Sequence, residues 1–470
     1  MKGSDHHFLH KFFYPESVAI VGASRNPFRA NYHLVSNLVR LGFQGRIYPI
    51  NPEAGDILGL KAYPSLKSID DHVDLAVVAV SYQTTPSLLK DCIEKDIKRV
   101  VLVAGGFSET GEEGRKVQEE MAALLKENGV RAIGPNALSP INPSTNFAIC
   151  FHPIDKIKTG GLSLIFQSGL YEPRIDWLFG DFNLHLNKLI DLGNKMDINE
   201  VDALTYLVQD PQTRVIGIHL ESVEGDGREF LRLIREGSRD KHIVVLKSGR
   251  TEAGAKAAAS HTGVIVQGND RVFDAALKQA GAIRAQTIEE FFDLTRALER
   301  FGTLLLPGNR DAIATLPGGE ALIVTDLCQY EGLTLARLQD RTIDRIRPIF
   351  PPWDISVNPF DLGVALQFID PRKVYPTLLD ALVNDPNVDV IAMQVPSRAF
   401  NIPREFFQCF PQALTAQKPI ALWLAGIPSG RVELLEWLEE QNIPVFPNPE
   451  KVIRALAALH RSSLFKFRRV

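Results

Sequence analysis

A single histidine stands among small residues in the segment KSGRTEAGAKAAASHTGVIVQGND, residues 247–270. Alanines and glycines on both sides leave the backbone open around His261, with hydroxyl groups next to its imidazole. A histidine presented in this way is suited to accept a phosphoryl group covalently. It needs a carboxylate to fix its tautomer and to support the charged intermediate, and Glu221, at the end of the expected strand GIHLES, is the candidate. A structural or merely exposed histidine is the alternative interpretation.

A second candidate region is VAIVGASRNP, residues 18–27, where an expected strand ends in Gly22 and a polar loop leads into a helix. Helix amides at the carboxyl end of a parallel strand favour anions, so this loop predicts a nucleotide or phosphate crevice. Arg25 and Arg29 are suited to bidentate phosphate contacts. Ser24 and Pro27 occupy positions where a full GxGxxG has glycines, which weakens the case for NAD. A tight turn without a ligand is the alternative.

Further loops follow later expected strands of the same unit. They are NPEAG at 51–55, VSYQTTP at 80–86, AGGFSE at 104–109 and IGPNALSP at 133–140. Loops at the carboxyl ends of parallel strands converge on one crevice, and an extended phosphate-bearing ligand fits this arrangement better than a metal does. No cluster of His, Cys and Asp at metal-ligand spacing is present there, and we expect no metal.

The elements that must position these loops alternate between short β-branched strands and longer helices, which predicts doubly wound parallel sheets. A first unit ends near SPINPST at 139–145, and a second ends with a helix over 288–301 and the linker-like LLLPGNR at 304–310. A third unit follows, its last helix covering 449–459, and we expect the basic tail FKFRRV to be frayed.

Composition narrows the functional classes. The 470 residues include 52 Lys and Arg against 56 Asp and Glu, a formal charge of −4, so there is no basic excess for a nucleic-acid surface. No apolar run approaches the roughly 20 residues of a membrane span. The first twenty residues lack the pattern of a secretory signal, and the four cysteines are widely spaced. We therefore expect a cytoplasmic protein without a disulfide framework.

The motifs taken together resemble the α subunit of NDP-forming acyl-CoA synthetases, relatives of succinyl-CoA synthetase. The resemblance covers nearly the whole chain and rests on motifs that fall in the family's order. These are VGASRNP, YPINPEAG, AGGFSETGEEG, IGPNALSPINP, QSG, DLGNKMDINEVDAL, LESVEGDGREF and LKSGRTEAGAKAAASHTG. It implies an α/β chain with a Rossmann-like CoA-binding domain over 1–145 and two flavodoxin-like CoA-ligase domains over 146–303 and 304–470. The second of these three domains would contain the SHTG histidine.

The resemblance also implies a reaction and a set of site residues. Acyl-CoA and phosphate give an acyl phosphate and free CoA, and the phosphoryl group passes through His261, supported by Glu221, to ADP or GDP on an ATP-grasp partner. The implied phosphate-binding residues are Gln167, Ser168, Gly169, Gly318 and Gly319. The implied CoA-binding residues are Gly22, Ser24, Arg25, Asn51, Val80, Gly106, Phe107, Ser108 and Asn136.

The chain departs from the family at both expected phosphate loops. Glu172 follows QSG where the family has small residues, and Glu320 follows Gly318–Gly319 where the family has Pro-Gly. A carboxylate at a helix N-terminus competes with a phosphate for the same amides. Ala137 also replaces the family's cysteine after Asn136. These changes suggest the hypothesis that phosphoryl transfer is reduced while CoA recognition is kept.

The leading interpretation is thus an ADP-forming acyl-CoA synthetase α subunit that binds CoA and phosphate, acts on a small carboxylic acid and its acyl-CoA, and meets Mg-ADP or Mg-ATP only through an ATP-grasp β subunit. We expect a hetero-oligomer or a homodimer, and no nucleic-acid or membrane partner. The alternative is a catalytically impaired CoA- or acyl-CoA-binding homologue with a regulatory or assembly role. An NAD(P)-dependent dehydrogenase is the least favoured class. The sequence defines neither the acyl group nor the choice between ADP and GDP.

Overall fold

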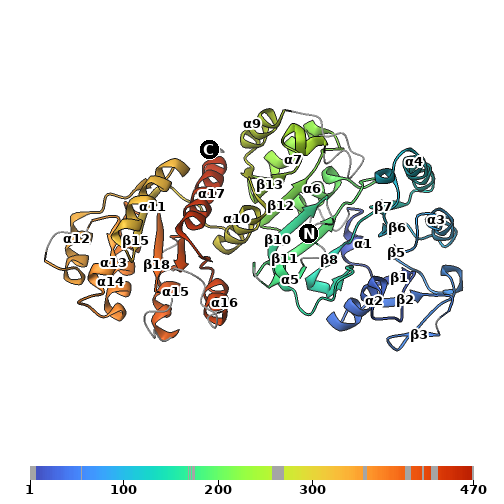
Figure 1. Cartoon of the computed structure of the whole chain (residues 1–470), viewed down its shortest axis with the longest axis horizontal. Helices are drawn as coiled ribbons and strands as arrows, with labels where there is room; N and C mark the ends of the chain where they lie inside the picture. Colours follow the sequence, from blue (N-terminus) through green and yellow to red (C-terminus); the bar gives the residue numbers. More distant parts are fainter. Residues whose placement is uncertain are drawn as a thin grey trace. The chain divides into compact units, whose positions relative to one another are not determined.

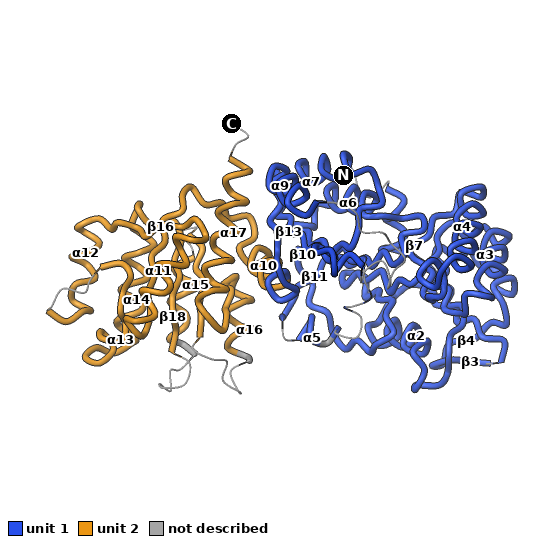
Figure 2. The backbone as a smooth tube through the Cα atoms, turned by 45° about the horizontal axis from the view of Figure 1, so that its top comes forward, with its two compact units in different colours: residues 1–291 blue, residues 292–470 orange. Residues whose placement is uncertain are grey.

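The structure is a computed structural model that describes residues 7–467, except 54, 168, 170, 172–174, 181, 257–268, 353–356, 397–403, 415–417 and 425–431. The chain divides into two compact units, residues 1–291 and 292–470, which Figure 2 colours separately.

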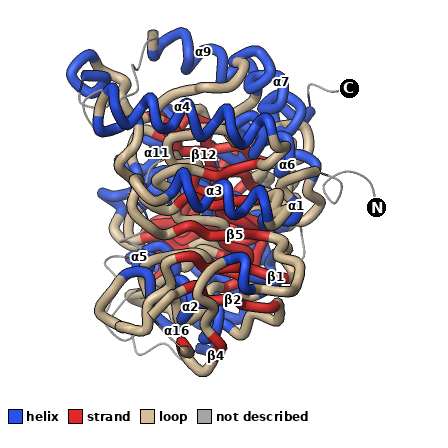
Figure 3. The backbone as a smooth tube through the Cα atoms, turned by 90° about the vertical axis from the view of Figure 1, so that its right-hand side faces the viewer, coloured by secondary structure: helices blue, strands red, loops and turns tan. Residues whose placement is uncertain are grey.

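Unit 1 begins with a parallel sheet in the order β2-β1-β5-β6-β7. Its strands are β1 (Ser17–Val21), β2 (Arg46–Ile50), β5 (Leu75–Val78), β6 (Arg99–Leu102) and β7 (Arg131–Ile133). Every residue of β1 and β5 is buried, as expected for strands covered on both faces. The connecting helices are α2 (Ala30–Leu41), α3 (Thr85–Glu94) and α4 (Glu112–Glu127), and Figure 3 shows α3 and α4 lying across the sheet. A small hairpin, β3 (Asp56–Ile57) and β4 (Leu60–Lys61), follows β2.

A second sheet in unit 1 has the order β14-β13-β12-β10-β11-β8-β9. Its parallel strands are β10 (Lys158–Phe166), β11 (His185–Asp191), β12 (Val215–Leu220), β13 (His242–Lys247) and β14 (Ile283–Ala285). The antiparallel edge consists of β8 (Ile141–Asn142) and β9 (Phe147–Ala148). The helices of this part are α5 (Ile175–Phe179), α6 (Glu200–Gln209), α7 (Gly227–Gly237) and α9 (Asp270–Ala280).

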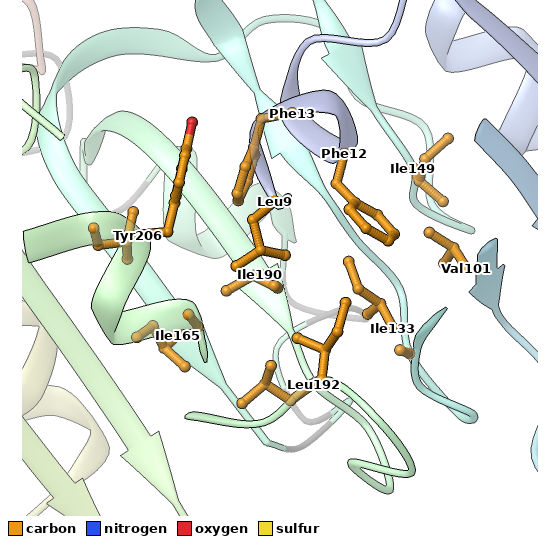
Figure 4. Packing of buried hydrophobic residues seen from close by; sticks show 14 of the residues in the cluster. Leu9, Phe12, Phe13, Val101, Ile133, Ile149, Ile165, Ile190, Leu192 and Tyr206 are labelled. Carbon is orange, nitrogen blue, oxygen red and sulfur yellow. The ribbon is translucent and has the colours of Figure 1, made fainter. Parts of the chain in front are cut away.

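One hydrophobic cluster joins the two sheets of unit 1 (Figure 4). Leu9, Phe12 and Phe13 on and next to α1 (His10–Phe13) contribute to it from the start of the chain. It also contains Ile133 of the first sheet and Ile190 of the second, both almost fully buried. The shared core explains why the first two sheets form a single compact unit.

Unit 2 contains a third sheet in the order β16-β15-β18-β19-β20, with β17 also paired to β15. Its strands are β15 (Arg310–Thr315), β16 (Thr334–Leu335), β17 (Phe360–Asp361), β18 (Val390–Val395), β19 (Ile420–Leu424) and β20 (Val445–Phe446). Its helices are α11 (Gly318–Glu331), α12 (Asp340–Ile346), α13 (Leu362–Ala365), α14 (Pro371–Val383), α15 (Cys409–Ala413), α16 (Val432–Glu440) and α17 (Pro449–Phe467). Figure 1 shows these elements in the orange to red part of the chain, after α10 (Ile288–Phe301).

Short 3-10 turns connect several of these elements. They are η2 (Leu66–Ser68), η3 (Ser108–Thr110), η4 (Pro143–Thr145), η6 (Arg347–Ile349) and η7 (Arg404–Gln408).

The segment 139–145, near which the first unit was expected to end, contains β8, and Ile141 of β8 pairs with Leu189 of the second sheet. One local expectation from the sequence was wrong. The basic tail is not frayed up to Phe467, because α17 continues to that residue and buries Ser462 and Ser463 on the way. The three-domain division at 145 and 303 stays a prediction.

Each sheet reverses its strand order next to its first long strand. The neighbours at these reversals are β1 and β5, β10 and β12, and β15 and β18. In open α/β sheets, ligands bind outside the carboxyl ends of the strands at such a reversal. The loops that follow these strands are therefore the expected ligand-binding positions.

Candidate active site

Gln167 and Glu221 meet at the carboxyl edge of the second sheet. Gln167 follows β10 and Glu221 follows β12, which pairs with β10 in parallel register. The Oε1 atom of Gln167 accepts hydrogen bonds from the backbone N–H groups of Glu221, at 2.8 Å, and Ser222, at 3.0 Å. The Nε2 group of Gln167 donates to the Ser222 Oγ atom at 3.1 Å. The predicted phosphate loop and the predicted supporting carboxylate are thus adjacent.

A buried ion pair lies beneath this turn. The Nζ group of Lys195 lies 3.0 Å from the Glu200 Oε2 atom, and it also donates to the carbonyl and hydroxyl oxygens of Ser222 at 2.9 and 3.2 Å. Glu200 accepts the backbone N–H groups of Glu224 and Gly225 through Oε1, at 2.8 Å each. The network fixes the backbone that follows Glu221.

The sequence places Glu200 in this network through a helix cap. Asn199 precedes α6, and its side chain accepts from the N–H groups of Val201 and Asp202, with the Asp202 side chain bonding back. This capping box sets the first turn of α6, which carries Glu200 at its first position.

Two lysines carry positive charge into this edge of the sheet. Lys247, the last residue of β13, donates to the Glu221 carbonyl oxygen at 2.6 Å. Burial lowers the pKa of both Lys195 and Lys247, and nearby carboxylates, including Glu221 for both, act in the opposite direction. Lys195 is held by Glu200 and Ser222, whereas Lys247 holds the backbone of Glu221 and Ser248.

His219 is a buried histidine of β12 that sequence analysis did not assign. Its Nε2 atom lies 2.7 Å from the Ser248 Oγ atom, and its ring meets the ring of Tyr171 edge-on. Burial, with Lys247 as the second cause, lowers the pKa of His219 to about 4. His219 is therefore mostly neutral at physiological pH, and its contact with Ser248 supports the end of β13.

The carboxyl ends of β1 and β5 approach closely at Gly22. This glycine has a φ of +86°, and a Cβ atom there would lie 2.6 Å from the Ala79 carbonyl oxygen. The Nδ2 group of Asn31 bridges the Gly22 and Ala79 carbonyl oxygens at 3.0 and 2.8 Å. A glycine is required here, because its positive φ and the close approach of Ala79 leave no room for a side chain.

The other predicted CoA-binding residues line loops at the same edge of the first sheet. Asn51 donates to the Ala23 carbonyl oxygen at 2.8 Å, and Gly106, at φ +107°, packs against the ring of Tyr82. Phe107 is fully buried and serves as core beneath its loop, so we expect no side-chain contact with CoA. The remaining residues are at least partly accessible: Ser24, Arg25, Val80, Ser108 and Asn136.

Hydrogen bonds between loops of the first and second sheets involve residues for which the sequence predicted no role. Asn194 donates to the Glu109 Oε2 atom at 2.6 Å and to the Gln118 Oε1 atom at 3.2 Å. Glu109 also accepts from the Gly106 N–H at 2.6 Å. These bonds tie the loop after β11 to the predicted CoA loop. Asn194 belongs to the motif DLGNK, and this motif was the signal from which the role could have been identified.

In unit 2, the predicted phosphate loop forms the start of α11. Gly318 is its first residue, and a Cβ atom there would lie 2.5 Å from the Asp361 Oδ2 atom. Glu320 lies in the same first turn, and burial raises the pKa of its carboxyl group. Two carboxyl groups thus lie near this helix N-terminus, while Gly319 is exposed.

Several predicted positions lie outside the described residues, namely His261, Ser168 and Glu172. Gly169 is described and exposed. Among the described residues, no group of three or more His, Cys, Asp or Glu side chains is arranged to hold a metal ion. No helix in the described part of the chain is both long enough and apolar enough to span a membrane.

Comparison with known families defines the class of this protein. Residues 16–142 match the family described as a CoA binding domain, and residues 159–298 match the succinyl-CoA ligase like flavodoxin domain. The fold is that of a CoA-binding domain followed by succinyl-CoA ligase-like flavodoxin architecture, as the resemblance implied, and the class is a CoA ligase.

Individual relatives identify the family. The chain is 36% identical over 471 residues to acetate–CoA ligase [ADP-forming] I subunit alpha of Pyrococcus furiosus, which covers 97% of this chain and 98% of that one. It is 36% identical over 466 residues to acetate–CoA ligase [ADP-forming] II of Archaeoglobus fulgidus, covering 98% of this chain and 68% of the relative. The chain belongs to the family of ADP-forming acyl-CoA ligases.

A solved structure agrees with this family assignment. The dinucleotide forming acetyl-coenzyme A synthetase 1 of Ca. Korarchaeum cryptofilum, in complex with phosphate and ADP, matches with a TM-score of 0.88 and 30% identity, over 98% of this chain and 99% of that one. The family uses CoA, phosphate and ADP or ATP. The enzyme interpretation is confirmed over the alternative of a non-catalytic CoA-binding homologue, and the question of a reduced rate stays a hypothesis.

Proposed function

We propose that this chain is the α-type subunit of a synthetase that joins a small carboxylic acid such as acetate to CoA. His261 carries the phosphoryl group between the nucleotide and the acid, and Glu221 supports it. The observation that carries the proposal is the contact between Gln167 and Glu221, 2.8 Å from Oε1 to N, at the strand-order reversal of the ligase sheet. Ligands bind at this edge in related architectures.

The roles of the side chains follow from their chemistry. In this proposal, the role of the Glu221 carboxylate is to hold one N–H of the His261 imidazole, so that the opposite ring nitrogen bears the phosphoryl group. The acid's carboxylate oxygen attacks phosphorus, the N–P bond breaks, and an acyl phosphate forms next to Gln167 and Gly169. The thiol sulfur of CoA then attacks the acyl carbon, the bond between that carbon and the phosphate oxygen breaks, and the leaving phosphate takes up the thiol proton. Lys195 and Lys247 hold the backbone around Glu221 in place.

CoA occupies the crevice at the carboxyl ends of β1 and β5. The backbone at Gly22 admits the phosphates, and the exposed Arg25 guanidinium pairs with them. Asn51 and Asn136 border the same crevice and hold its loops. The thiol end extends toward the loop at 134–138, because that loop is tied through Asp191 to the ligase sheet.

We further propose an ATP-grasp partner that holds Mg-ADP or Mg-ATP. The Pyrococcus furiosus relative, matched over 98% of its length, is named as an alpha subunit. In the Archaeoglobus fulgidus relative, about a third of the chain lies outside the match, which supports a further module that completes the reaction. We place the hetero-oligomer in the cytoplasm, where CoA and ATP are available.

The experiment combines the chain with the ATP-grasp protein that co-purifies with it, Mg²⁺ and γ-labelled ATP. We expect acid-labile phosphate on the chain, and acetyl-CoA when acetate and CoA are added. His261→Ala should abolish both, while CoA still raises the melting temperature of the variant. CoA-dependent stabilisation of the wild-type chain without any phosphorylation or acyl-CoA formation would show a binding protein and overturn the proposal.

A further inference from the structure

Glu109 lies where a loop of the first sheet meets a loop of the second. Its Oε1 atom accepts the N–H group of Gly106, a predicted CoA-binding residue, at 2.6 Å. Its Oε2 atom accepts the Nδ2 group of Asn194, in the loop after β11, at 2.6 Å. Hydrogen bonds to a carboxylate are stronger than those between neutral groups. One side chain of the first sheet therefore holds both loops.

The backbone of the Asn194 loop is also fixed against the first sheet. The N–H group of Asn194 donates to the Pro135 carbonyl oxygen at 2.9 Å. The preceding residue, Gly193, has a φ of +54°, and a Cβ atom there would collide with the same oxygen. The next residue of the CoA loop, Asn136, donates its N–H to the Ala104 carbonyl oxygen at 3.0 Å. The three loops thus form one hydrogen-bonded unit, in which none can shift alone.

Lys195 extends this unit to the predicted phosphate loop. It directly follows Asn194, and its Nζ group donates to the carbonyl and hydroxyl oxygens of Ser222 at 2.9 and 3.2 Å. The N–H group of Ser222 in turn donates to the Oε1 atom of Gln167 at 3.0 Å. A shift of the backbone at Asn194 therefore moves the group that anchors Ser222 and, through it, Gln167.

We propose that Glu109 is a positioning residue that couples CoA binding to the phosphoryl group. The inference rests on the proposed function, which places CoA at the Gly106 loop and the phosphoryl group next to Gln167. CoA restrains the loop that Glu109 holds, and Glu109 restrains Asn194 on the other side. A ligand that restrains one end of such a unit reduces the conformational freedom that a ligand at the other end must remove. The two ligands should therefore strengthen each other's binding, by the same factor in both directions.

The test exchanges the two polar groups that meet between the loops. Asn194→Asp places a second carboxylate against Glu109, and the repulsion breaks the contact. The double variant Glu109→Gln/Asn194→Asp has the net charge of the wild type. In it, the new amide N–H donates to the new carboxylate, while the amide oxygen still accepts from Gly106. The double variant should therefore restore the contact that the single variant loses.

The measured quantity is the Kd for CoA of the reconstituted enzyme, before and after phosphorylation by Mg-ATP and removal of the nucleotide. We expect phosphorylation to lower this Kd about fivefold to tenfold in the wild type and in the double variant. In Asn194→Asp the effect should be smaller than about twofold. Asn194→Ala, which removes the donor without adding a charge, should lose the effect as well. A merely structural role would change the melting temperature without changing this ratio of affinities.

Asp197 supplies the matched control, because its carboxylate also joins the two sheets. It accepts the Nε group of Arg131 at 2.9 and 3.1 Å and the N–H group of Ala132 at 2.7 Å, so it holds β7 instead of the CoA loop. Asp197→Asn should lower stability but leave the effect of phosphorylation on the Kd for CoA within about twofold of the wild-type effect.

Two kinds of failure can be told apart. The inference alone is overturned if the enzyme makes acetyl-CoA but phosphorylation leaves the Kd for CoA unchanged, if Asn194→Asp and Asn194→Ala keep the full effect, or if the double variant does not restore it. An enzyme that binds no CoA, or that Mg-ATP does not phosphorylate, would instead overturn the proposed function on which the inference rests.

Discussion

The Nζ group of Lys195 lies 3.0 Å from the Oε2 atom of Glu200, and neither side chain is exposed to solvent. Two charges buried together are stable only when their remaining polar atoms are also bonded. Here the lysine donates to Ser222 and the glutamate accepts two backbone N–H groups. The pair therefore fixes the loop after Glu221 and links it to the start of α6.

Removing one charge of this pair should be costly. Lys195→Met leaves the Glu200 carboxylate buried without its cation, and we expect the free energy of unfolding to fall by about 3–5 kcal/mol in urea denaturation. Lys278→Met removes an exposed pairing with Asp274 and should cost less than about 0.5 kcal/mol. Similar losses in the two variants would show that the buried pair is not a structural support of the site.

The sequence predicted the sheets because the strands are short apolar runs separated by amphipathic helices, a local pattern. The strands expected to end at Gly22 and at Glu221 are present as Ser17–Val21 and Val215–Leu220. The edge strand β8 was missed because two residues carry no periodicity, and only its pairing with β11 and β9 makes it a strand. The end of α17 was missed because a basic composition does not show whether a helix face is buried.

Residues of the candidate site could be predicted only where a sequence motif indicates a chemical role. Gln167 and Glu221 were assigned from their motifs, and the structure brings them into contact. Lys195 and Asn194 stood in the quoted motif DLGNK without a role, because a lysine in a loop is usually solvated. Their roles depend on contacts with residues distant in the sequence, Ser222 and Glu109, that no local pattern contains.

The buried His219 should make the free energy of unfolding depend on pH. Since its pKa lies at about 4 instead of the usual 6.5, the unfolded chain binds a proton between these pH values that the folded chain does not. The free energy of unfolding therefore rises with pH in this window. The stability that this residue contributes, about 3 kcal/mol, is lost as pH falls toward 4. His219→Gln should flatten the difference between pH 4.5 and 7 in urea denaturation. An unchanged pH profile in the variant would contradict the assignment.

The glycine at the end of β1 should be essential for CoA binding. Gly22→Ala places a Cβ atom 2.6 Å from the Ala79 carbonyl oxygen, so the two strand ends must separate. Gly42→Ala is the matched control, because Gly42 also has a positive φ, +78°, but has no neighbour within 4 Å of the added atom. Both should lose about 1–2 kcal/mol of stability from backbone strain. Only Gly22→Ala should weaken CoA binding more than about tenfold in calorimetry. If the two variants bind CoA with equal affinity, Gly22 is not part of the CoA site.

Asp311 should make unit 2 less stable in alkaline solution. The residue is fully buried at the start of β15, its Oδ2 atom accepts from the Cys328 thiol at 3.6 Å, and burial raises its pKa to about 7. The folded chain then binds a proton between about pH 4 and 7 that the unfolded chain releases, so stability is lost as pH rises through 7. Asp311→Asn should stabilise the protein by about 2–4 kcal/mol at pH 8 and little at pH 4. Equal effects at both pH values would show that ionisation of Asp311 is not the cause.

Glu320 should slow phosphoryl transfer if the start of α11 binds the phosphate. Glu320 lies in the first turn of the helix with its carboxyl group facing Trp423 and Gln394, and a carboxylate this close to the helix N-terminus repels a phosphate bound there. Glu320→Gln removes that charge, and we expect the rate of phosphorylation of the chain by ATP and its partner to rise about threefold to tenfold. Asp326→Asn, an exposed change further along the same helix, should leave the rate unchanged. A rate that stays the same or falls in Glu320→Gln would mean that α11 does not hold the phosphate, or that this carboxyl group takes part in the transfer.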